Sequence, residues 1–565
     1  MAAIAIAISL ALLVLLGVAA SNQEVSVAWL LVPAVLLVAA VQRFRKFLRV
    51  QNRMSRLRRY YDRAAERLEG KWPEGGADGE EFLAADHPYA RDLNVFGEGS
   101  LFELLCIARS AIGRRGLAQY LLSAPAFEEI HLRQAAVQEL KEQTKLREQV
   151  ALVGEFEAHE SRWETFSDWV DLPVISFPKP LRIVALGSSA AVACLLLSGL
   201  FRLLAWPLVA QGLMPFLALH ALIGMHFRDR IHQMIASLGA LSIESQVLRE
   251  GLQLLEAHEF QSPKLRQLVD RIRGSAKAVR SLERMMDALA ERNKDWFYLP
   301  SLIFLVATQL CMAIEDWRMK HGSELRLWID VWGEFEALNA LANYAYENPE
   351  NTFPVVSGGA ALYEAEGLGH PLLLSETCVR NDVRFNGDCR FYVISGSNMS
   401  GKSTLLRAIG LNAVLAFAGA PVRAKELRLS RLVVCSSLSV MDSLQHGKSK
   451  FMAEMDRLRL TIQMTGQGEP VLFLIDEIFS GTNSRDRRAA AEAVVRTLLD
   501  RGAIGALSTH DLALTEIASA ALCGTNVHTC SRDGSDPMDF DYLLKQGVTT
   551  EANALAIARL AGVPV

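Results

Sequence analysis

One segment, Phe391–Thr404, constrains the fold and chemistry of this chain more than any other. It reads FYVISGSNMSGKST and holds the spacing G-x-x-x-x-G-K-S from Gly396 to Ser403. An apolar run, Tyr392–Ile394, predicts a buried strand before this spacing, and Thr404–Ile409 predicts a helix after it. Glycines let backbone N–H groups approach phosphate oxygens, and a helix N-terminus adds positive potential. The strand–loop–helix order therefore predicts a loop that binds the phosphates of a nucleotide.

The side chains of this loop have separate expected roles. Lys402 is expected to reach the β- and γ-phosphates of ATP, and Ser403 is expected to bind Mg²⁺. The residues expected to bind the nucleotide are Gly396, Ser397, Asn398, Met399, Ser400, Gly401, Lys402, Ser403 and Thr404. The alternative is a glycine-rich turn that ends in Lys-Ser by chance, and a second motif downstream argues against it.

That second motif is a pair of carboxylates after another buried strand. The sequence VLFLIDEIFSGTNSRD, Val471–Asp486, opens with five apolar residues, as parallel strands buried on both faces do. Asp476 and Glu477 follow this run, at the strand end where α/β sheets bind ligands. We expect Asp476 to hold Mg²⁺ through water and Glu477 to polarise the attacking water. The alternative is a solvated strand end, which a nearby phosphate loop makes the weaker explanation.

A histidine follows a third predicted strand, Ala503–Leu507. The strand leads into Ser508-Thr509-His510-Asp511. Taken alone, His510 is an ordinary histidine at a strand end. Beside the two phosphate motifs, it is expected to contact the γ-phosphate or the attacking water.

Four segments together resemble the MutS family, whose ATPase is of the ABC type. They are SGSNMSGKST in the phosphate loop, DEIFSGTNSRD (Asp476–Asp486), MDSLQHGKSKFMAEM (Met441–Met455) and STHD (Ser508–Asp511). The segments that open and close the family's ATPase domain have counterparts in Gly367–Asp382 and Phe540–Pro564. The resemblance implies an α/β P-loop ATPase that uses ATP and Mg²⁺.

The resemblance continues upstream into the helical core and levers of the family. Gly97–Leu105 and Ile130–Leu140 are similar to the start of that region, and Trp317–Pro354 is similar to its return to the ATPase. The match therefore covers most of residues 90–565. Nothing before residue 90 resembles the mismatch-reading domain with its aromatic wedge. We also expect neither of the family's C-terminal extensions after Val565.

The resemblance implies ATP sites shared between two copies of the chain. In the ABC arrangement, a serine of one copy approaches the γ-phosphate held by the other, and Ser449 matches that serine. The family commonly has Ser-Thr where this chain has Ser449-Lys450. The family's aromatic residue against adenine is replaced by Cys378, which cannot stack. Tyr542 matches a family histidine near the base and could stack instead, or it could be a half-buried strand tyrosine.

Composition narrows the remaining classes of protein. Lysine and arginine number 59 against 63 acidic residues, so the net charge of −4 does not by itself indicate nucleic-acid binding. Eight cysteines include no C-x-x-C pair. This pattern favours reduced thiols in the cytosol and argues against a zinc site.

The N-terminal region predicts a transmembrane hairpin. Ala2–Ala20 and Val25–Val41 are apolar, and Arg43–Arg59 then carries eight basic residues and no acidic one. The positive-inside rule places both ends of such a hairpin in the cytoplasm. A signal peptide ending near Ala20 is the alternative, but it lacks a basic start. The basic run either fixes this topology or contacts DNA or anionic lipid.

Two further apolar regions need separate interpretations. Ile183–Phe201 and Leu204–Phe227 approach the ~20 residues that span a bilayer and predict a second hairpin. Trp296–Ile314 is also apolar, but five crossings would place the phosphate loop on the wrong side. We therefore interpret it as a buried core helix.

These observations predict an α/β P-loop ATPase domain after a mainly helical core and lever region, with two transmembrane hairpins. The expected divisions are 1–42 (hairpin), 43–89 (basic helix and linker), 90–180 (core and lever), 181–227 (hairpin), 228–354 (lever and core) and 355–565 (ATPase). We expect a multi-pass protein of the cell membrane, with its ATPase in the cytoplasm.

The expected function is that of a membrane-anchored MutS-like ATPase related to DNA mismatch repair. The resemblance implies a homodimer that engages duplex DNA through backbone contacts. A membrane-tethered scaffold or signalling ATPase without DNA binding is one alternative. A transporter is another, although four spans split by soluble helices and no LSGGQ-type sequence argue against it.

Overall fold

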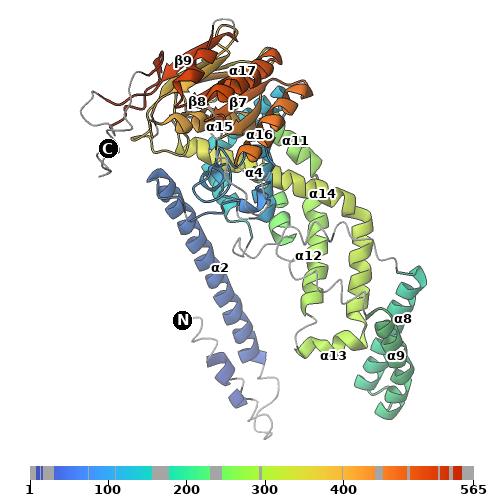
Figure 1. The fold of residues 1–565 in the computed structure, drawn as a ribbon. Coiled ribbons are helices and arrows are strands. Elements are labelled where there is room, and N and C mark those ends of the chain that lie inside the picture. Colours follow the sequence, from blue (N-terminus) through green and yellow to red (C-terminus); the bar gives the residue numbers. More distant parts are fainter. Residues whose placement is uncertain are drawn as a thin grey trace, which may run out of the picture. The chain divides into compact units, whose positions relative to one another are not determined.

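The computed structural model divides the chain into two compact units, Met1–Leu68 and Glu69–Val565. Figure 1 shows the helices and strands and labels several of them. The structure describes residues 8–12, 14–16, 31–73, 75–84, 86–108, 110–154, 169, 177–228, 245–291, 295–397, 399–438, 450–479, 484–519, 522–532 and 539–549.

The first unit is dominated by one long helix, α2 (Leu31–Leu68), of 38 residues. Proline stands only in its first turn, and no glycine or proline follows from Ala34 to Leu68. The helix therefore joins the end of the predicted span Val25–Val41 to the whole basic run without a break. Residues 17–30 lie outside the described part of the chain, so the turn of the first predicted hairpin stays a prediction.

Helices form the first half of the second unit. Ser100 and Ser110 cap two of them, because their side chains accept hydrogen bonds from the backbone N–H groups of Glu103 and Gly113. Residues 245–256 are also helical. The bounded helices are α3 (Leu101–Leu105), α4 (Ala111–Leu122), α5 (Phe127–Glu142), α6 (Thr144–Ala151), α11 (Pro263–Arg271), α12 (Ser275–Glu291) and α14 (Val306–Glu347).

The long helix α14 crosses α4 at two glycines. A Cβ atom on Gly116 would lie 2.2 Å from the carbonyl oxygen of Gly333, so only glycine permits this approach. The Tyr120 hydroxyl donates to Glu334 at 3.0 Å beside the crossing, and Lys264 pairs with the same glutamate at 2.6 Å. Helix α14 is therefore fixed firmly to the helices that begin the predicted core.

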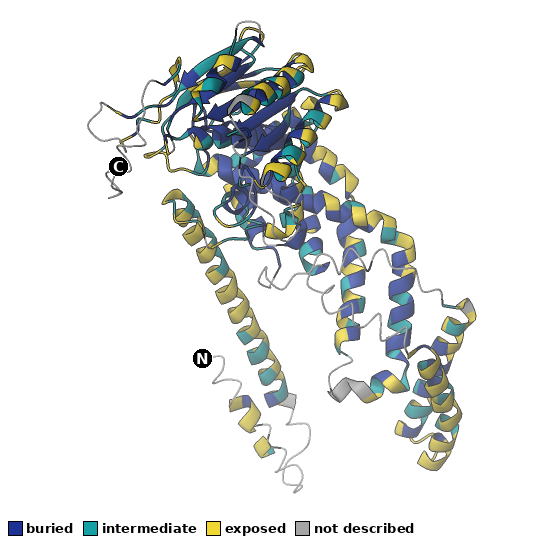
Figure 2. Ribbon diagram, viewed as in Figure 1, coloured by how far each residue is buried: buried dark blue, intermediate teal, exposed yellow. Residues whose placement is uncertain are grey.

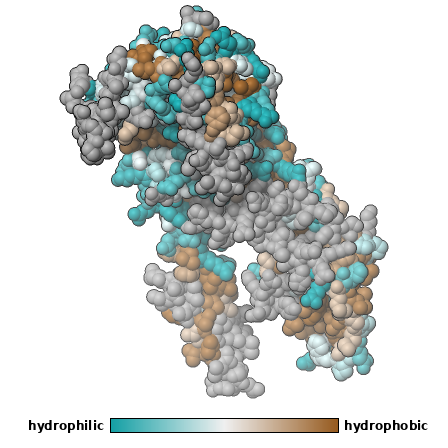
Figure 3. Space-filling model, in the orientation of Figure 1, coloured by the Kyte–Doolittle hydropathy of each residue, from teal (hydrophilic) through white to brown (hydrophobic). Residues whose placement is uncertain are grey.

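The two helices expected in the second hairpin are present as α8 (Lys179–Leu200) and α9 (Trp206–His226), whereas their crossing of a membrane stays a prediction. Arg202, in the turn, has a left-handed φ of 59°. Among the described residues, two helices are long and apolar enough to cross a membrane, Pro180–Leu200 and Trp206–His226. Only 22% and 17% of their most apolar windows are buried, and Figure 3 shows the resulting brown surface.

The prediction of one core helix over Trp296–Ile314 is wrong in part. The segment is divided between α13 (Asp295–Ile303) and α14, and Leu305 at the break has a φ of 51°. Cys311 and Ile314 are buried as expected, but Leu299 is 66% exposed. The break is stabilised from the hairpin, because Ser189 donates to the Phe304 carbonyl at 2.9 Å and His220 contacts the Ile303 carbonyl at 2.8 Å.

The C-terminal half contains two sheets. The larger has the order β10-β9-β4-β8-β7-β6, parallel except for the short β10, and the smaller has the order β1-β5-β2-β3. The strands are β1 (Val355–Ser357), β2 (Tyr363–Leu368), β3 (Asn381–Phe385), β4 (Phe391–Ser395), β5 (Glu426–Ser430), β6 (Val433–Ser437), β7 (Val471–Asp476), β8 (Ile504–Thr509), β9 (Gly524–His528) and β10 (Lys545–Gln546).

Helices cover both faces of the larger sheet. Alternate strand residues face opposite sides, so Ile394 and Leu474 join the core that includes α15 (Lys402–Ala418), whereas Val393 and Phe473 join a second core. That second core includes side chains of α16 (Lys450–Met464) and α17 (Ser484–Asp500). Figure 2 shows the sheet as buried between these layers. The fold is thus a doubly covered α/β sheet, as the sequence predicts.

Candidate active site

The three predicted motifs meet at one edge of the larger sheet. Ser395 at the end of β4 is in register with Thr509 of β8, and Asp476 at the end of β7 is in register with Ser508. Parallel strands that end in register place their following loops side by side. The phosphate loop, the carboxylate pair and the histidine therefore surround the same space.

The phosphate loop depends on two glycines at its ends. Gly401 has a φ of 90°, and an added Cβ would lie 2.9 Å from the Tyr542 ring. An added Cβ on Gly396 would lie 2.6 Å from the Thr529 hydroxyl oxygen. Ser400 supports the loop from behind, with its hydroxyl 2.8 Å from the Ser397 carbonyl oxygen. Helix α15 begins directly after the loop, so its N-terminus points at the space the loop encloses.

Lys402 folds back over the loop that carries it. Its Nζ donates to the carbonyl oxygens of Gly396 at 2.9 Å and Ser397 at 2.7 Å. Burial lowers the pKa of Lys402, while the nearby carboxylates of Asp476 and Glu477 act in the opposite direction. A buried ammonium at this position favours an anionic ligand, because an anion supplies the charge that desolvation leaves uncompensated.

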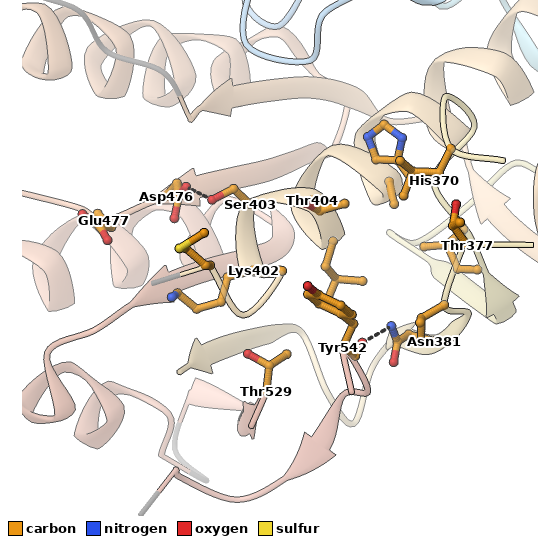
Figure 4. A pocket seen from close by; sticks show the side chains of 17 residues that line it. His370, Thr377, Asn381, Lys402, Ser403, Thr404, Asp476, Glu477, Thr529 and Tyr542 are labelled. Atoms are coloured by element: carbon orange, nitrogen blue, oxygen red, sulfur yellow. Dashed lines mark hydrogen bonds between the residues drawn. The ribbon is translucent and has the colours of Figure 1, made fainter. Parts of the chain in front are cut away.

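Two hydroxyls converge on the carboxylate of Asp476. The hydroxyls of Ser403 and Ser508 each donate a hydrogen bond to one of its two oxygens. Figure 4 shows the Ser403–Asp476 contact. A hydroxyl and a carboxylate suit Mg²⁺, which takes few protein ligands and completes its shell with water and phosphate oxygens. Among the described residues, no cluster of three or more His, Cys, Asp or Glu side chains offers a closed metal site.

Glu477 and His510 form the second polar pair. His510 Nδ1 lies 3.1 Å from Glu477 Oε1, and both side chains are partly exposed to solvent. Glu477 takes a left-handed φ of 53°, and its backbone N–H donates to the Ser508 carbonyl at 3.1 Å. A left-handed non-glycine residue at a strand end is uncommon and often occurs at functional sites. The carboxylate is thereby turned toward the histidine of the next strand.

Glu454 supports the turn after this pair. It is a buried residue of α16 and accepts a hydrogen bond from the backbone N–H of Phe479. Arg487 of α17 donates to the Phe479 carbonyl at 3.0 Å and pairs with Asp511 at 3.4 Å. The FMAEM, SRD and STHD segments are therefore joined around the turn that carries Glu477.

A cavity of about 750 Å³ extends from the phosphate loop toward the smaller sheet. Figure 4 shows Asp476 and Glu477 at one end of it and His370 and Thr377 at the other. It is lined by Leu368, His370, Leu373, Thr377, Val379, Asn381, Met399, Gly401, Lys402, Ser403, Thr404, Leu405, Ala408, Asp476, Glu477, Thr529 and Tyr542. Its volume and its polar end suit a nucleotide rather than a phosphate ion alone.

The side chains near the far end include residues that sequence reasoning missed. Asn381 fixes the segment that carries Tyr542, because its Nδ2 donates to the Tyr542 carbonyl at 3.0 Å and its Oδ1 accepts from the Leu544 N–H at 2.7 Å. Burial lowers the pKa of His370 to about 4, so its ring is neutral at pH 7. Both residues belong to Gly367–Asp382, which is similar to the segment that opens the family's ATPase domain. The sequence does not show that this segment lies beside the phosphate loop, so only the three-dimensional structure assigns the two residues to the cavity.

The other predicted site residues have different positions. Tyr542 lines the cavity and is 44% exposed, whereas Cys378 is not among the lining residues. Ser397 and Ser400 shape the loop through their own contacts and do not line the cavity. Asn398 and Ser449 lie outside the described residues, so their predicted roles stay predictions.

Comparison with known proteins identifies the C-terminal part of the chain. The family model described as MutS domain V matches residues 392–565. The chain carries a MutS-family ATPase domain. An ATPase domain agrees with the arrangement of the phosphate loop, the carboxylate pair and the histidine. Such a domain implies that ATP and Mg²⁺ are the ligands of the cavity.

Curated relatives support the same assignment. The chain is 34% identical over 241 residues to DNA mismatch repair protein MutS 2 of Halobacterium salinarum. The aligned stretch covers 42% of this chain and 26% of that protein. It is 30% identical over 298 residues to DNA mismatch repair protein MutS of Methanococcoides burtonii, with shares of 48% and 33%. For the MutS protein of Sorangium cellulosum the identity is 34% over 253 residues, with shares of 43% and 27%.

The match is partial on both sides. The chain spans about a quarter to a third of the length of these curated relatives. The shared part supports an ATPase related to those of DNA mismatch repair proteins.

Proposed function

We propose that this protein is a membrane-anchored, ATP-hydrolysing clamp that works as a dimer on duplex DNA. One observation carries the proposal of hydrolysis: Lys402, the Ser403–Asp476 pair and Glu477 line one end of a single cavity, and His510 contacts Glu477 from outside that lining. Each group has a place in a phosphoryl-transfer reaction.

The residues divide the work between binding and water activation. Lys402 would exchange its loop carbonyls for the β- and γ-phosphate oxygens, and Ser403 with Asp476 would hold Mg²⁺. The metal would neutralise charge that develops on the phosphates. Glu477 would orient and polarise the attacking water, and His510, at 3.1 Å from Glu477, would fix that carboxylate and reach the γ-phosphate.

The base would be bound at the far end of the cavity. Tyr542 supports this proposal because its ring lies against Gly401 and its backbone is held by Asn381. Stacking by Tyr542 would replace the aromatic contact that Cys378 cannot make. The neutral His370 offers hydrogen bonding at that end of the cavity without adding a charge.

The dimer is proposed from the resemblance of Met441–Met455 to the family's signature segment. The described residues around the cavity supply the phosphate loop, the metal ligands and the water-activating pair from one copy. In the ABC arrangement, Ser449 of a second copy would contact the γ-phosphate. Kinship with repair proteins supports duplex DNA as the ligand, gripped through its backbone, because no base-reading segment is evident in the sequence.

The membrane anchor is proposed from α8 and α9. A core helix of a soluble protein is mostly buried, but these two 21-residue apolar segments expose large side chains such as Ile183 (74%) and Met225 (65%). Burying this surface in lipid removes it from water, which is favourable by ~25 cal/mol per Å². With the apolar N-terminal segments, this supports a multi-pass protein of the cell membrane with its ATPase in the cytoplasm.

The direct test of hydrolysis is steady-state ATP turnover by the full chain in detergent or lipid nanodiscs, with Mg²⁺. The wild type should hydrolyse ATP, and Lys402→Ala should reduce turnover to the background, because the phosphates lose their main cation. Wild-type turnover no higher than that of Lys402→Ala would overturn the proposal. Membrane fractionation with a carbonate wash tests the anchor, and release of the chain into the wash would refute it.

A further inference from the structure

The helix α2 carries an apolar stripe with the spacing of a coiled coil. From residue 47 onward, apolar positions recur in steps of three and four through three heptads, and they are Phe47, Val50, Met54, Leu57, Tyr61, Ala64 and Leu68. At 100° per residue these positions lie within about 100° of the helix circumference. A stripe this narrow and regular fits the seam between two helices rather than the broader apolar face that packs on a globular core.

The stripe is exposed within the unit that contains it. Phe47 and Met54 are each 60% exposed, and Leu68 is 62% exposed. Basic residues are frequent on the remaining circumference, as at Arg49 and Arg59. The helix thus exposes a continuous apolar seam flanked by charge, and such a seam is stabilised when a second helix covers it.

We propose that the stripe binds the same stripe of a second copy as a parallel, in-register coiled coil. This inference rests on the proposed function, which already requires two copies with the same orientation in the membrane. Anchoring would hold both α2 helices parallel and at high local concentration, so even a three-heptad seam could pair. Each apolar position would then face its own counterpart.

Lipid is a poorer occupant of the stripe. The helix is unbroken from Leu31 to Leu68, so it leaves the apolar segment along its own axis. At ~1.5 Å per residue, Leu57 lies roughly 20 Å along the helix from Arg43, beyond the reach of a bilayer surface. DNA is also a poorer occupant, because apolar side chains offer nothing to phosphates, although the basic faces would stay open to it.

The flanking charges set the salt dependence of this pairing. In a parallel pair, Arg53 of one copy would lie opposite Arg58 of the other, and like charges there weaken association. Asp62 lies 3.5 Å from Arg58 and offsets part of this repulsion. Added salt should therefore strengthen the pairing of α2, whereas it weakens binding of duplex DNA.

Site-specific disulfide formation tests the proposal in the full chain in nanodiscs. Leu57→Cys lies on the stripe and Asn52→Cys lies on the opposite face. Oxidation should link Leu57→Cys into dimers at least about tenfold more than Asn52→Cys, with the unmodified chain as background for the native cysteines. Met54→Cys should also link, because in-register pairing brings both stripe positions together.

Three results would overturn the pairing. They are equal linkage at the two faces, no linkage at either face, or Leu57→Cys protected from a water-soluble maleimide only when anionic lipid is present. Repeating the linkage with Lys402→Ala separates this inference from the proposed function. If Leu57→Cys links but the chain without added cysteines does not hydrolyse ATP, the coiled coil stands and the proposed function fails. If the chain hydrolyses ATP but Leu57→Cys does not link, only the coiled coil is rejected.

Discussion

Lys402 and Asp476 both stabilise the local fold through hydrogen bonds and line the cavity proposed to bind the nucleotide. Lys402 satisfies the carbonyls of Gly396 and Ser397, yet its burial lowers its pKa and so disfavours its charge. Asp476 similarly binds two hydroxyls through its two oxygens. These contacts hold both side chains beside the cavity in which we propose that ATP and Mg²⁺ bind.

Glu477→Gln should separate ATP binding from turnover. The amide keeps the size of the side chain but cannot polarise water as a carboxylate does, so we expect the rate of hydrolysis to fall by about 10²–10⁴-fold. The dissociation constant for ATP should change little, because Lys402 and Ser403 are intact. Steady-state hydrolysis and equilibrium nucleotide binding measure the two effects, and a variant with normal turnover would contradict the role of Glu477.

His370 should make the protein less stable in acid. Its pKa is lowered to about 4 in the folded chain, mainly by burial, against an ordinary value of 6.5. Below pH 6.5 His370 is protonated in the unfolded chain, whereas in the folded chain it stays neutral until the pH approaches 4. The free energy of unfolding therefore decreases as the pH falls from 6.5 toward 4. At pH 5 the loss is about 2 kcal/mol.

The measurement is the free energy of unfolding at pH 7 and pH 5 for the wild type and for His370→Gln. The loss between these two pH values should be smaller in the variant by about that amount. An equal loss in both chains would show that His370 does not titrate as its burial implies.

At the scale of elements, the motifs could be predicted from sequence because each is local. The strands before Gly396, Asp476 and His510 occur as expected, although β8 includes Ser508 and Thr509. The contributions of His370, Asn381 and Glu454 depend on contacts between distant segments, so no local pattern could reveal them. The break between α13 and α14 was missed for the same reason, since side chains of α8 and α9 bind its carbonyls.

The crossing of α4 and α14 gives a test at this scale. Gly116→Ala places a Cβ against the Gly333 carbonyl, so the helices must separate, and we expect a loss of about 1–3 kcal/mol in stability. Gly322→Ala is the matched control in α14, because its Cβ would meet only the Arg318 side chain at 3.7 Å. Thermal unfolding compares the two, and equal midpoints would refute the close crossing.

At the scale of the whole molecule, we propose that helices connect an ATPase to a membrane anchor. The ATPase is supported by kinship and by geometry, whereas the anchor rests on exposed apolar helices. The helix α14 links these regions physically, because one end follows the break bound by α8 and α9 and the other leads into the ATPase. A change of helix packing at the ATPase would therefore be passed toward α8 and α9, which are the proposed anchor.

DNA binding should be insensitive to mismatches. No segment resembles the wedge that intercalates at an unstacked step, and contacts to the backbone carry no base information. We expect matched and mismatched duplexes to bind with dissociation constants within a few-fold of each other, and both to weaken with salt. Titration of the full chain in nanodiscs measures this, and a preference of about a hundredfold, or 2.7 kcal/mol, would reveal a recognition element.

If two copies complete each ATP site, as we propose, then mixing two inactive variants should restore hydrolysis. Lys402→Ala disables the phosphate loop of its own copy, and Ser449→Ala removes the residue that should act on the other copy. In a mixed dimer, one of the two sites keeps both residues. Equal mixing makes half of the dimers mixed, so hydrolysis should return to about a quarter of the wild-type rate. Two inactive variants that stay inactive after mixing, although mixed dimers form, would contradict the shared site.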